Sequence, residues 1–120
     1  MADKDDFGRA GEAQAARYLA HAGYEIIDRN WRCPGGEIDI VAVDGIELVV
    51  VEVKTRRSES FGHPFEAVDA RKRARLWRLA HRWVAAHPDA SARHRVRIDL
   101  VGITGADPAT ARLEHLRDLR

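Results

Sequence analysis

Three acidic residues and one lysine lie in two short apolar segments of this chain, and their spacing suits metal-dependent chemistry. Glu37 and Asp39 lie in the first segment, and Glu52 and Lys54 lie in the second. One residue separates the members of each pair, which is the side-chain period of a β-strand, so each pair lies on one side of its strand. Hard divalent cations take carboxylate oxygens as ligands. The pattern therefore predicts a Mg²⁺ or Mn²⁺ site that hydrolyses a phosphodiester.

An Asp-Gly pair at 44–45 separates the two segments and predicts a hairpin. If those two residues form the loop, Val43 pairs with Ile46, and counting outward places Glu37 opposite Glu52. The acids and the lysine then share one face, whereas a slip by one residue would divide them between two faces. Like charges opposite each other are destabilising, and a bound cation reverses that cost.

Each residue of this group has a predicted role. Asp39 and Glu52 are the expected metal ligands, and the backbone carbonyl of Val53 is an expected additional ligand. Lys54 would orient the attacking water or stabilise charge in the transition state. Glu37 would be a ligand, hold a water molecule or assist Lys54. The alternative for the whole group is an ion-paired strand face without a metal.

Composition narrows the class of protein. The chain has 120 residues, one cysteine and a formal net charge of +1. The length favours one domain, and a single cysteine excludes an internal disulfide and a thiolate zinc site. The acidic N-terminus argues against a secretory signal, and no apolar run approaches the roughly 20 residues of a membrane span. We therefore expect a cytoplasmic protein without membrane contact.

Charge is unevenly distributed along the chain. Residues 1–52 hold eleven acids and five Lys or Arg, whereas residues 71–97 hold nine Lys or Arg and one acid. A basic segment beside an acidic cluster suits a polyanion, so DNA is the expected partner, with RNA as the alternative. A solvated helix face is the other interpretation. The residues expected to contact nucleic acid are Lys72, Arg56, Arg75, Arg78 and Arg82.

Periodicity and caps predict two main helices. The first covers about residues 5–22 and is ended by Gly23. On spacing alone its Glu12 is a surface glutamate, unless that face packs over the acidic cluster. The second covers about residues 70–86, and Lys72 continues its buried stripe. Lys72 therefore points toward the cluster or extends along the rim of the core.

Alternating and apolar runs predict the strands. They cover residues 24–31, 37–43, 46–54 and 95–103, with a weak edge strand at 110–117. The order αβββαβ(β) implies an α/β domain with a central mixed sheet flanked by helices.

The motifs resemble known families. Asp39 and the run Glu52-Val53-Lys54, after a leading helix, resemble the catalytic core of the restriction-endonuclease-like, or PD-(D/E)XK, nucleases. Longer stretches resemble the YraN family, small bacterial proteins of largely unassigned function that are similar to archaeal Holliday junction resolvases. The resemblance spans about residues 7–103 of a single domain, 1–120, and leaves 104–120 as a tail or edge strand. The stretches that resemble the YraN family are residues 8–19, 23–32, 36–39, 51–56, 62–68 and 97–101, together with the single position Lys72.

The resemblance implies a restriction-endonuclease-like fold and a Mg²⁺-dependent or Mn²⁺-dependent endonuclease acting on DNA, including branched or irregular structures. Glu37 and Lys72 match further motif positions. By analogy with resolvases, a homodimer is expected. Two alternatives stay open, a nucleic-acid-binding protein without catalytic turnover and a protein-interaction scaffold. The residues that the resemblance places at metal and catalytic positions are Glu12, Asp39, Glu52 and Lys54.

Overall fold

A computed structural model describes residues 4–60, 62–92, 94–107 and 109–119. Its helices are α1 (Lys4–His21), the 3₁₀ turn η1 (Pro64–Ala67), α2 (Ala70–Ala86) and the short α3 (Pro88–Ser91). Its strands are β1 (Glu25–Cys33), β2 (Gly36–Asp44), β3 (Glu47–Arg56), β4 (Arg95–Thr104) and β5 (Arg112–Leu116). This order confirms the predicted α/β class, and the weak strand predicted in the tail is present as β5.

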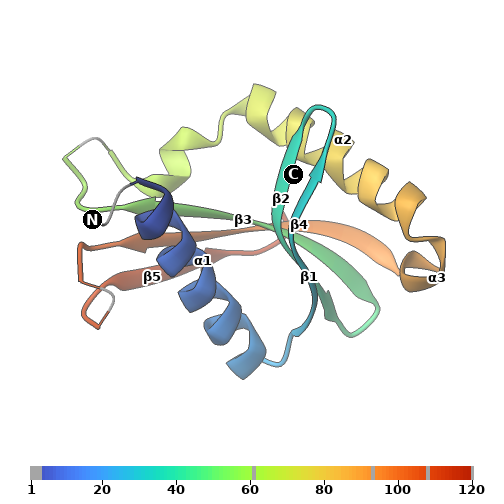
Figure 1. Cartoon of the computed structure of the whole chain (residues 1–120), viewed down its shortest axis with the longest axis horizontal. Helices are drawn as coiled ribbons and strands as arrows, with labels where there is room; N and C mark the ends of the chain where they lie inside the picture. The colour runs from blue at the N-terminus through green and yellow to red at the C-terminus, as the bar shows by residue number, and fades with distance from the viewer. Residues whose placement is uncertain (1–3, 61, 93, 108, 120) are drawn as a thin grey trace.

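The strands form one five-stranded sheet in the order β1-β2-β3-β4-β5 (Figure 1). Neighbours pair antiparallel except β3 and β4, which are parallel. A parallel pair needs a crossover connection, and η1, α2 and α3 supply it. The sheet is therefore mixed, as the sequence predicts, and α2 lies in the crossover between β3 and β4.

Local signals in the sequence set the helix boundaries. The chain leaves α1 through Gly23, whose φ of +97° is a conformation that glycine adopts without strain. The side chain of Asp69 caps α2 by accepting a hydrogen bond of 3.0 Å from the Lys72 N–H. α2 ends before Pro88, which cannot continue a helix.

The predicted hairpin register is wrong by two residues. Asp44 pairs with Glu47, so Gly45 and Ile46 form the loop, and Val43 pairs with Leu48 instead of Ile46. Gly45 has a φ of +62° at the first loop position, the position where a type II′ turn requires glycine. The shift leaves Ile46 exposed and Leu48 fully buried. Because it is an even number of residues, every side chain keeps its face.

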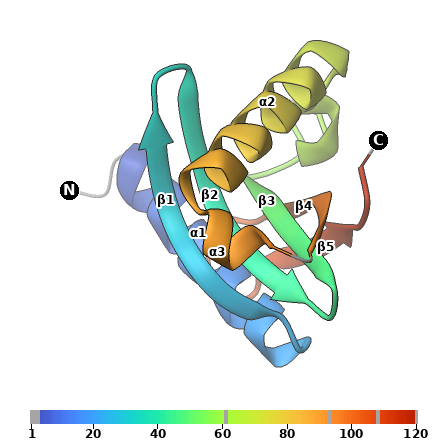
Figure 2. The same ribbon diagram turned by 90° about the vertical axis from the view of Figure 1, so that its right-hand side faces the viewer.

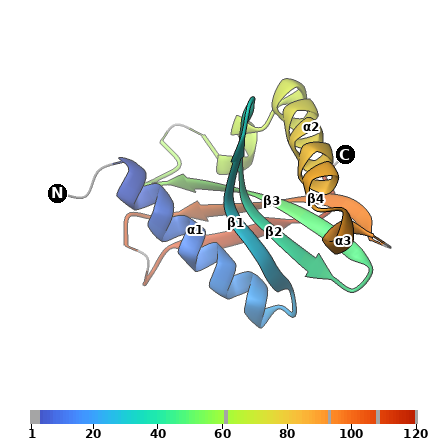
Figure 3. The same ribbon diagram turned by 45° about the vertical axis from the view of Figure 1, so that its right-hand side comes forward.

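The two large helices cover opposite faces of the sheet (Figures 2 and 3). Ala15 and Leu19 of α1 pack on the face that carries Val51, whereas Leu79 and Trp83 of α2 pack on the other face. Among the described residues, no helix has the length and apolar character needed to span a membrane.

α1 approaches β3 closely because Gly11 has no side chain. A Cβ atom at Gly11 would clash with the hydroxyl oxygen of Thr55 on β3. This contact sets the height of the helix above the sheet, and with it the position of the adjacent Glu12.

Candidate metal centre

The centre lies where β2 separates from β3. Backbone pairing of the two strands ends at Ile40 and Val51, although both strands continue beyond that pair. Extending the register by one step places Asp39 opposite Glu52. The Asp39 carboxylate accepts a hydrogen bond of 2.8 Å from the Val53 N–H. A side-chain oxygen thus replaces a backbone carbonyl at the point of separation and holds Asp39 beside β3.

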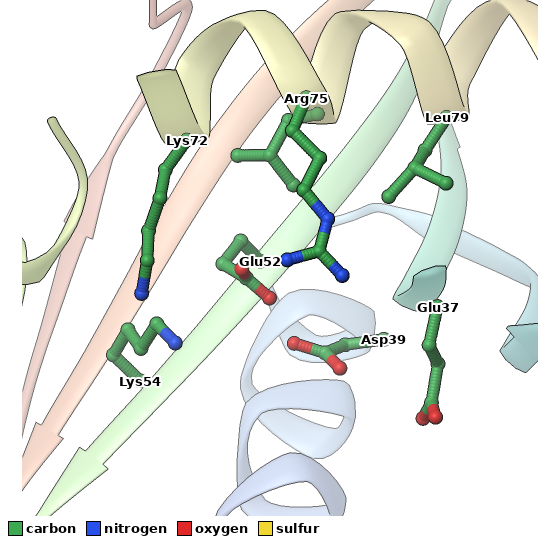
Figure 4. Close-up of a pocket in the computed structure, with 8 residues that line it drawn as sticks. Glu37, Asp39, Glu52, Lys54, Lys72, Arg75 and Leu79 are labelled. Carbon is green, nitrogen blue, oxygen red and sulfur yellow. The ribbon is translucent and has the colours of Figure 1, made fainter. Parts of the chain in front are cut away.

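One pocket of about 280 Å³ between the sheet and α2 brings together the acids and the lysine of β2 and β3, namely Glu37, Asp39, Glu52 and Lys54. Figure 4 shows Asp39 between Glu52 and Glu37, and the amino groups of Lys54 and Lys72 on the opposite side of the pocket. The structure therefore favours the first of the two interpretations of Lys72, because its side chain lines the pocket. The remaining lining residues are Arg75, Leu76 and Leu79.

Glu12 reaches this group from the opposite face of the sheet. Carboxylate oxygens of Glu12, Glu37 and Asp39 lie within 4.8 Å of one another. α1 packs on the face opposite α2, so Glu12 meets Asp39 at the separation of β2 from β3. Three elements, α1, β2 and β3, thus contribute acids to one centre.

Asn30 on β1 connects two of these acids. With its amide nitrogen facing the carboxylates, Asn30 donates hydrogen bonds of 2.7 Å to Glu12 Oε2 and 3.1 Å to Glu37 Oε1. Its φ of +55° lies in the left-handed region, which asparagine tolerates better than most residues. Sequence reasoning assigned Asn30 no role, because nothing in a strand pattern reveals this backbone conformation.

The acids perturb one another. Burial, followed by the nearby Glu52, raises the pKa of Asp39 well above its usual range, although the Val53 N–H opposes this. Burial, followed by the charges of Asp39 and Glu37, raises the pKa of Glu12 to about 7. Crowded carboxylates retain protons because their charged forms repel one another. A cation would remove the repulsion and displace those protons.

Most of this charge is not neutralised by ion pairs. Of the four acids, only Glu37 lies within 4.0 Å of a basic group of the described chain, at 3.0 Å from Arg32. Lys54, Lys72 and Arg75 line the pocket without forming an ion pair of that length to any described residue. An ion-paired strand face, the alternative interpretation of the sequence, does not describe this arrangement.

A second group of possible metal ligands differs from the first because its acids form ion pairs. Glu59, His63 and Glu114 also present ligand atoms within 4.8 Å of one another. Here His63 Nε2 lies 2.6 Å from Glu114, and Arg112 pairs with both glutamates. Because these acids already have positive partners, the group needs no metal.

Three other residues predicted to contact nucleic acid lie outside the pocket. Arg56 is half-buried near the end of β3 and does not line the pocket. Arg78 and Arg82 line a second, smaller hollow next to this pocket, and Arg75 lines both. Sequence reasoning placed Arg75 with the residues that contact nucleic acid and missed its position over the acids. The signal is its spacing of three residues from Lys72 on one helix.

Comparison with other proteins adds the family. Residues 11–103 match the model of the Uncharacterised protein family UPF0102. A UPF0102 protein of Paenarthrobacter aurescens is 56% identical over 117 residues, which cover 98% of this chain and 95% of that protein. A UPF0102 protein of Beutenbergia cavernae is also 56% identical over 117 residues, covering 98% of each chain. The chain therefore belongs to the uncharacterised protein family UPF0102.

Proposed function

We propose that this protein is a divalent-metal-dependent endonuclease that hydrolyses phosphodiesters in DNA, including branched or irregular structures. The observation that carries the proposal is the convergence of acids from β2 and β3 at one pocket that also holds basic side chains, with Glu12 of α1 within 4.8 Å of two of these acids. Carboxylates crowded in this way suit a divalent cation, because of these acids only Glu37 has an ion pair with a described residue. The resemblance to PD-(D/E)XK nucleases at Asp39 and Glu52-Val53-Lys54 supports the same reaction.

The residues present fit a Mg²⁺ or Mn²⁺ ion. Asp39 and Glu52 would hold it together with Glu12 or Glu37, whose oxygens lie within 4.8 Å of those of Asp39. A bound cation supplies a more acidic water and neutralises charge on the scissile phosphate. The carbonyl of Val53 stays a predicted ligand. The raised pKa of Glu12 supports the fit, because it reflects excess negative charge that a cation would compensate.

The chain's own basic residues would bind and orient the substrate. Lys54 lies two residues from Glu52 on the same face of β3 and lines the same pocket. It would hold the attacking water or stabilise the negative charge that develops on the phosphate. Lys72 faces it from α2 and would bind the phosphate as a point charge. Leu76 and Leu79 of α2 supply the apolar part of the pocket lining.

The basic face of α2 also supports a second candidate, nucleic-acid binding without turnover. Arg75, Arg78 and Arg82 are exposed along this helix, and phosphate contacts of this kind need no metal. The two candidates differ in the role of the acids, because binding alone would survive loss of Asp39 or Glu52. A homodimer, which the resemblance implies, would offer two such centres to a junction of two-fold symmetry.

The test combines calorimetric titration of Mn²⁺ with cleavage of single-stranded, duplex, flap and four-way DNA. We expect Asp39→Asn and Glu52→Gln to lose both Mn²⁺ binding and cleavage. Lys54→Met should retain Mn²⁺ binding and lose cleavage by about 100-fold or more. Glu59→Gln is the matched control, because Glu59 belongs to the second group of possible ligands and is already paired with Arg112.

Failure of the wild type to bind Mn²⁺ would overturn the proposal. Mn²⁺ binding without cleavage of any of the four DNA structures would favour the second candidate.

A further inference from the structure

Three arginines of α2 surround a hollow beside the metal centre. Arg75, Arg78 and Arg82 follow each other at spacings of three and four residues, which places them on one side of the helix. With Gly35 and Leu79 they line a hollow of about 80 Å³. Arginines on a solvated helix face usually extend into water, whereas these converge on the β1–β2 turn. We call this hollow the arginine notch.

The β1–β2 turn holds two of the guanidinium groups in place. Arg75 Nε donates a hydrogen bond of 3.2 Å to the carbonyl of Gly35, and Arg82 donates one to the carbonyl of Pro34. Glycine makes this approach possible. A Cβ at Gly35 would lie 2.8 Å from Arg82 Nη1, and a Cβ at Gly36 would lie 2.8 Å from Arg75 Nη2.

The notch retains unused hydrogen-bond donors. A guanidinium has five N–H donors, and Arg75 and Arg82 each donate one to the turn. Arg78 makes no hydrogen bond or ion pair with any other described residue. No carboxylate of the described chain lies within 4.0 Å of these three guanidinium groups. Positive charge held in a fixed position without a counter-charge is prepared for an anion.

Arg75 joins the notch to the metal centre. It lines both the notch and the acidic pocket, and Figure 4 shows its side chain extending from α2 toward Glu52 and Asp39. An anion in the notch therefore lies beside any phosphate bound at the acids. In a nucleic acid, that neighbour is another phosphate of the same backbone.

We infer that the arginine notch is a phosphate subsite, which holds a DNA backbone phosphate next to the one at the metal centre. This rests on the proposed function for the nature of the substrate. The bound strand then follows α2 from Lys72 toward Arg82. Because phosphate contacts carry no base information, the notch fixes the direction of the strand and not its sequence.

Fluorescence anisotropy with labelled single-stranded and duplex 20-mers tests this inference, in EDTA so that binding is measured without cleavage. The double variant Arg78→Lys/Arg82→Lys keeps the net charge but loses the planar fork of donors. We expect its Kd to rise at least about fivefold, equally for unrelated DNA sequences. Arg73→Lys is the matched control, because it lies about 200° around the helix from Arg75, and its Kd should not change.

Wild-type affinity in the double lysine variant would overturn the inference, since a diffuse positive field would be sufficient. If thermal melting shows that this variant is unfolded, Arg78→Lys alone decides, because Arg78 makes no hydrogen bond within the described chain. Replacing both Arg78 and Arg82 with glutamine should reduce the slope of log K against log salt concentration by the amount of about two phosphate contacts.

The outcome is independent of the metal centre. Arginine-dependent binding by a wild type that never cleaves DNA would retain the subsite and reject the nuclease. If the wild type cleaves DNA and the double lysine variant binds DNA with unchanged Kd, the nuclease is retained and the subsite is rejected.

Discussion

The carboxylate of Asp39 and the backbone N–H of Val53 form a hydrogen bond of 2.8 Å at the point where β2 leaves β3. Val53 directly follows Glu52, so this bond holds two carboxylates close together. Asp39 cannot relieve the repulsion by turning away without leaving the Val53 N–H unpaired. The acidic centre is therefore built into the sheet, and its charge has to be balanced by protons or by a cation.

Asp39→Asn should stabilise the metal-free protein. The amide oxygen can still accept from the Val53 N–H, and the neutral amide avoids the proton uptake that the raised pKa of Asp39 imposes on folding at pH 8. We expect the free energy of unfolding in EDTA at pH 8 to rise by about 1 kcal/mol or more, measured by urea denaturation. Wild type at a Mn²⁺ concentration of about 100 times Kd should gain about 2.7 kcal/mol, and the variant should gain nothing. A variant less stable than wild type in EDTA would contradict this account.

Glu12 should make stability and metal affinity depend on pH. Its pKa is raised from 4.5 to about 7, so between these values the folded chain holds a proton that the unfolded chain has released. Stability should therefore fall as pH rises through this window. Mn²⁺ displaces the same proton, so affinity should rise with pH up to about 7.

Calorimetry at pH 6 in two buffers of different ionisation enthalpy measures the released protons. Glu12→Gln should reduce their number, whereas Glu25→Gln, at an exposed glutamate of β1, should leave it unchanged. An equal proton release from wild type and Glu12→Gln would show that another group carries the proton.

Gly11 should be intolerant of a side chain, because a Cβ there clashes with Thr55. We expect Gly11→Ala to lower the free energy of unfolding by about 1–3 kcal/mol and to weaken Mn²⁺ binding by displacing the adjacent Glu12. Gly8→Ala is the matched control on the same helix, since nothing lies within 4 Å of a Cβ there. It should stabilise the protein by about 0.5–1 kcal/mol. Adding Thr55→Ala should partly rescue Gly11→Ala; no rescue would mean that the clash lies elsewhere.

Asp99 should support the fold and not the centre. It is fully buried on the α1 face and accepts hydrogen bonds from Arg97 Nε at 2.9 Å and His115 Nε2 at 2.8 Å. Burial opposes its charge, but the hydrogen bonds from His115, Arg97 and the Asp118 N–H outweigh burial and lower the pKa of Asp99 to about 2. We expect Asp99→Asn to cost up to about 3 kcal/mol, because Arg97 loses its fully buried counter-charge and keeps only the partly exposed Asp44 at 3.2 Å and Glu47 at 3.9 Å.

Because the pKa of Asp99 is depressed, its contribution is complete above pH 3.8 and is lost as pH falls toward 2. Urea denaturation of wild type and variant at pH 7 and pH 3 should show the difference between them shrinking at the lower pH. The folded variant should still bind Mn²⁺ as wild type does. Loss of Mn²⁺ binding in a folded Asp99→Asn protein would place Asp99 in the centre after all.

The sequence by itself determined which side chains share a face of the sheet. Glu37, Asp39, Glu52 and Lys54 line one pocket, although the hairpin register differs from the predicted one. The reason is that side chains alternate with a period of two, so an error of two residues moves the partners and preserves the faces. Helical periodicity placed Lys72 at the end of the buried stripe of α2 but left its direction open, and only the structure places its side chain at the pocket.

Only the tertiary structure decided which acids from other elements join them. The position of Glu12 depends on where α1 crosses the sheet and on how far β2 departs from β3, and neither is encoded in local periodicity. Asn30 depends on one left-handed backbone angle, and the arginine notch depends on how closely the glycine turn approaches α2. These are contacts between segments distant in the chain, which spacing within a single element does not determine.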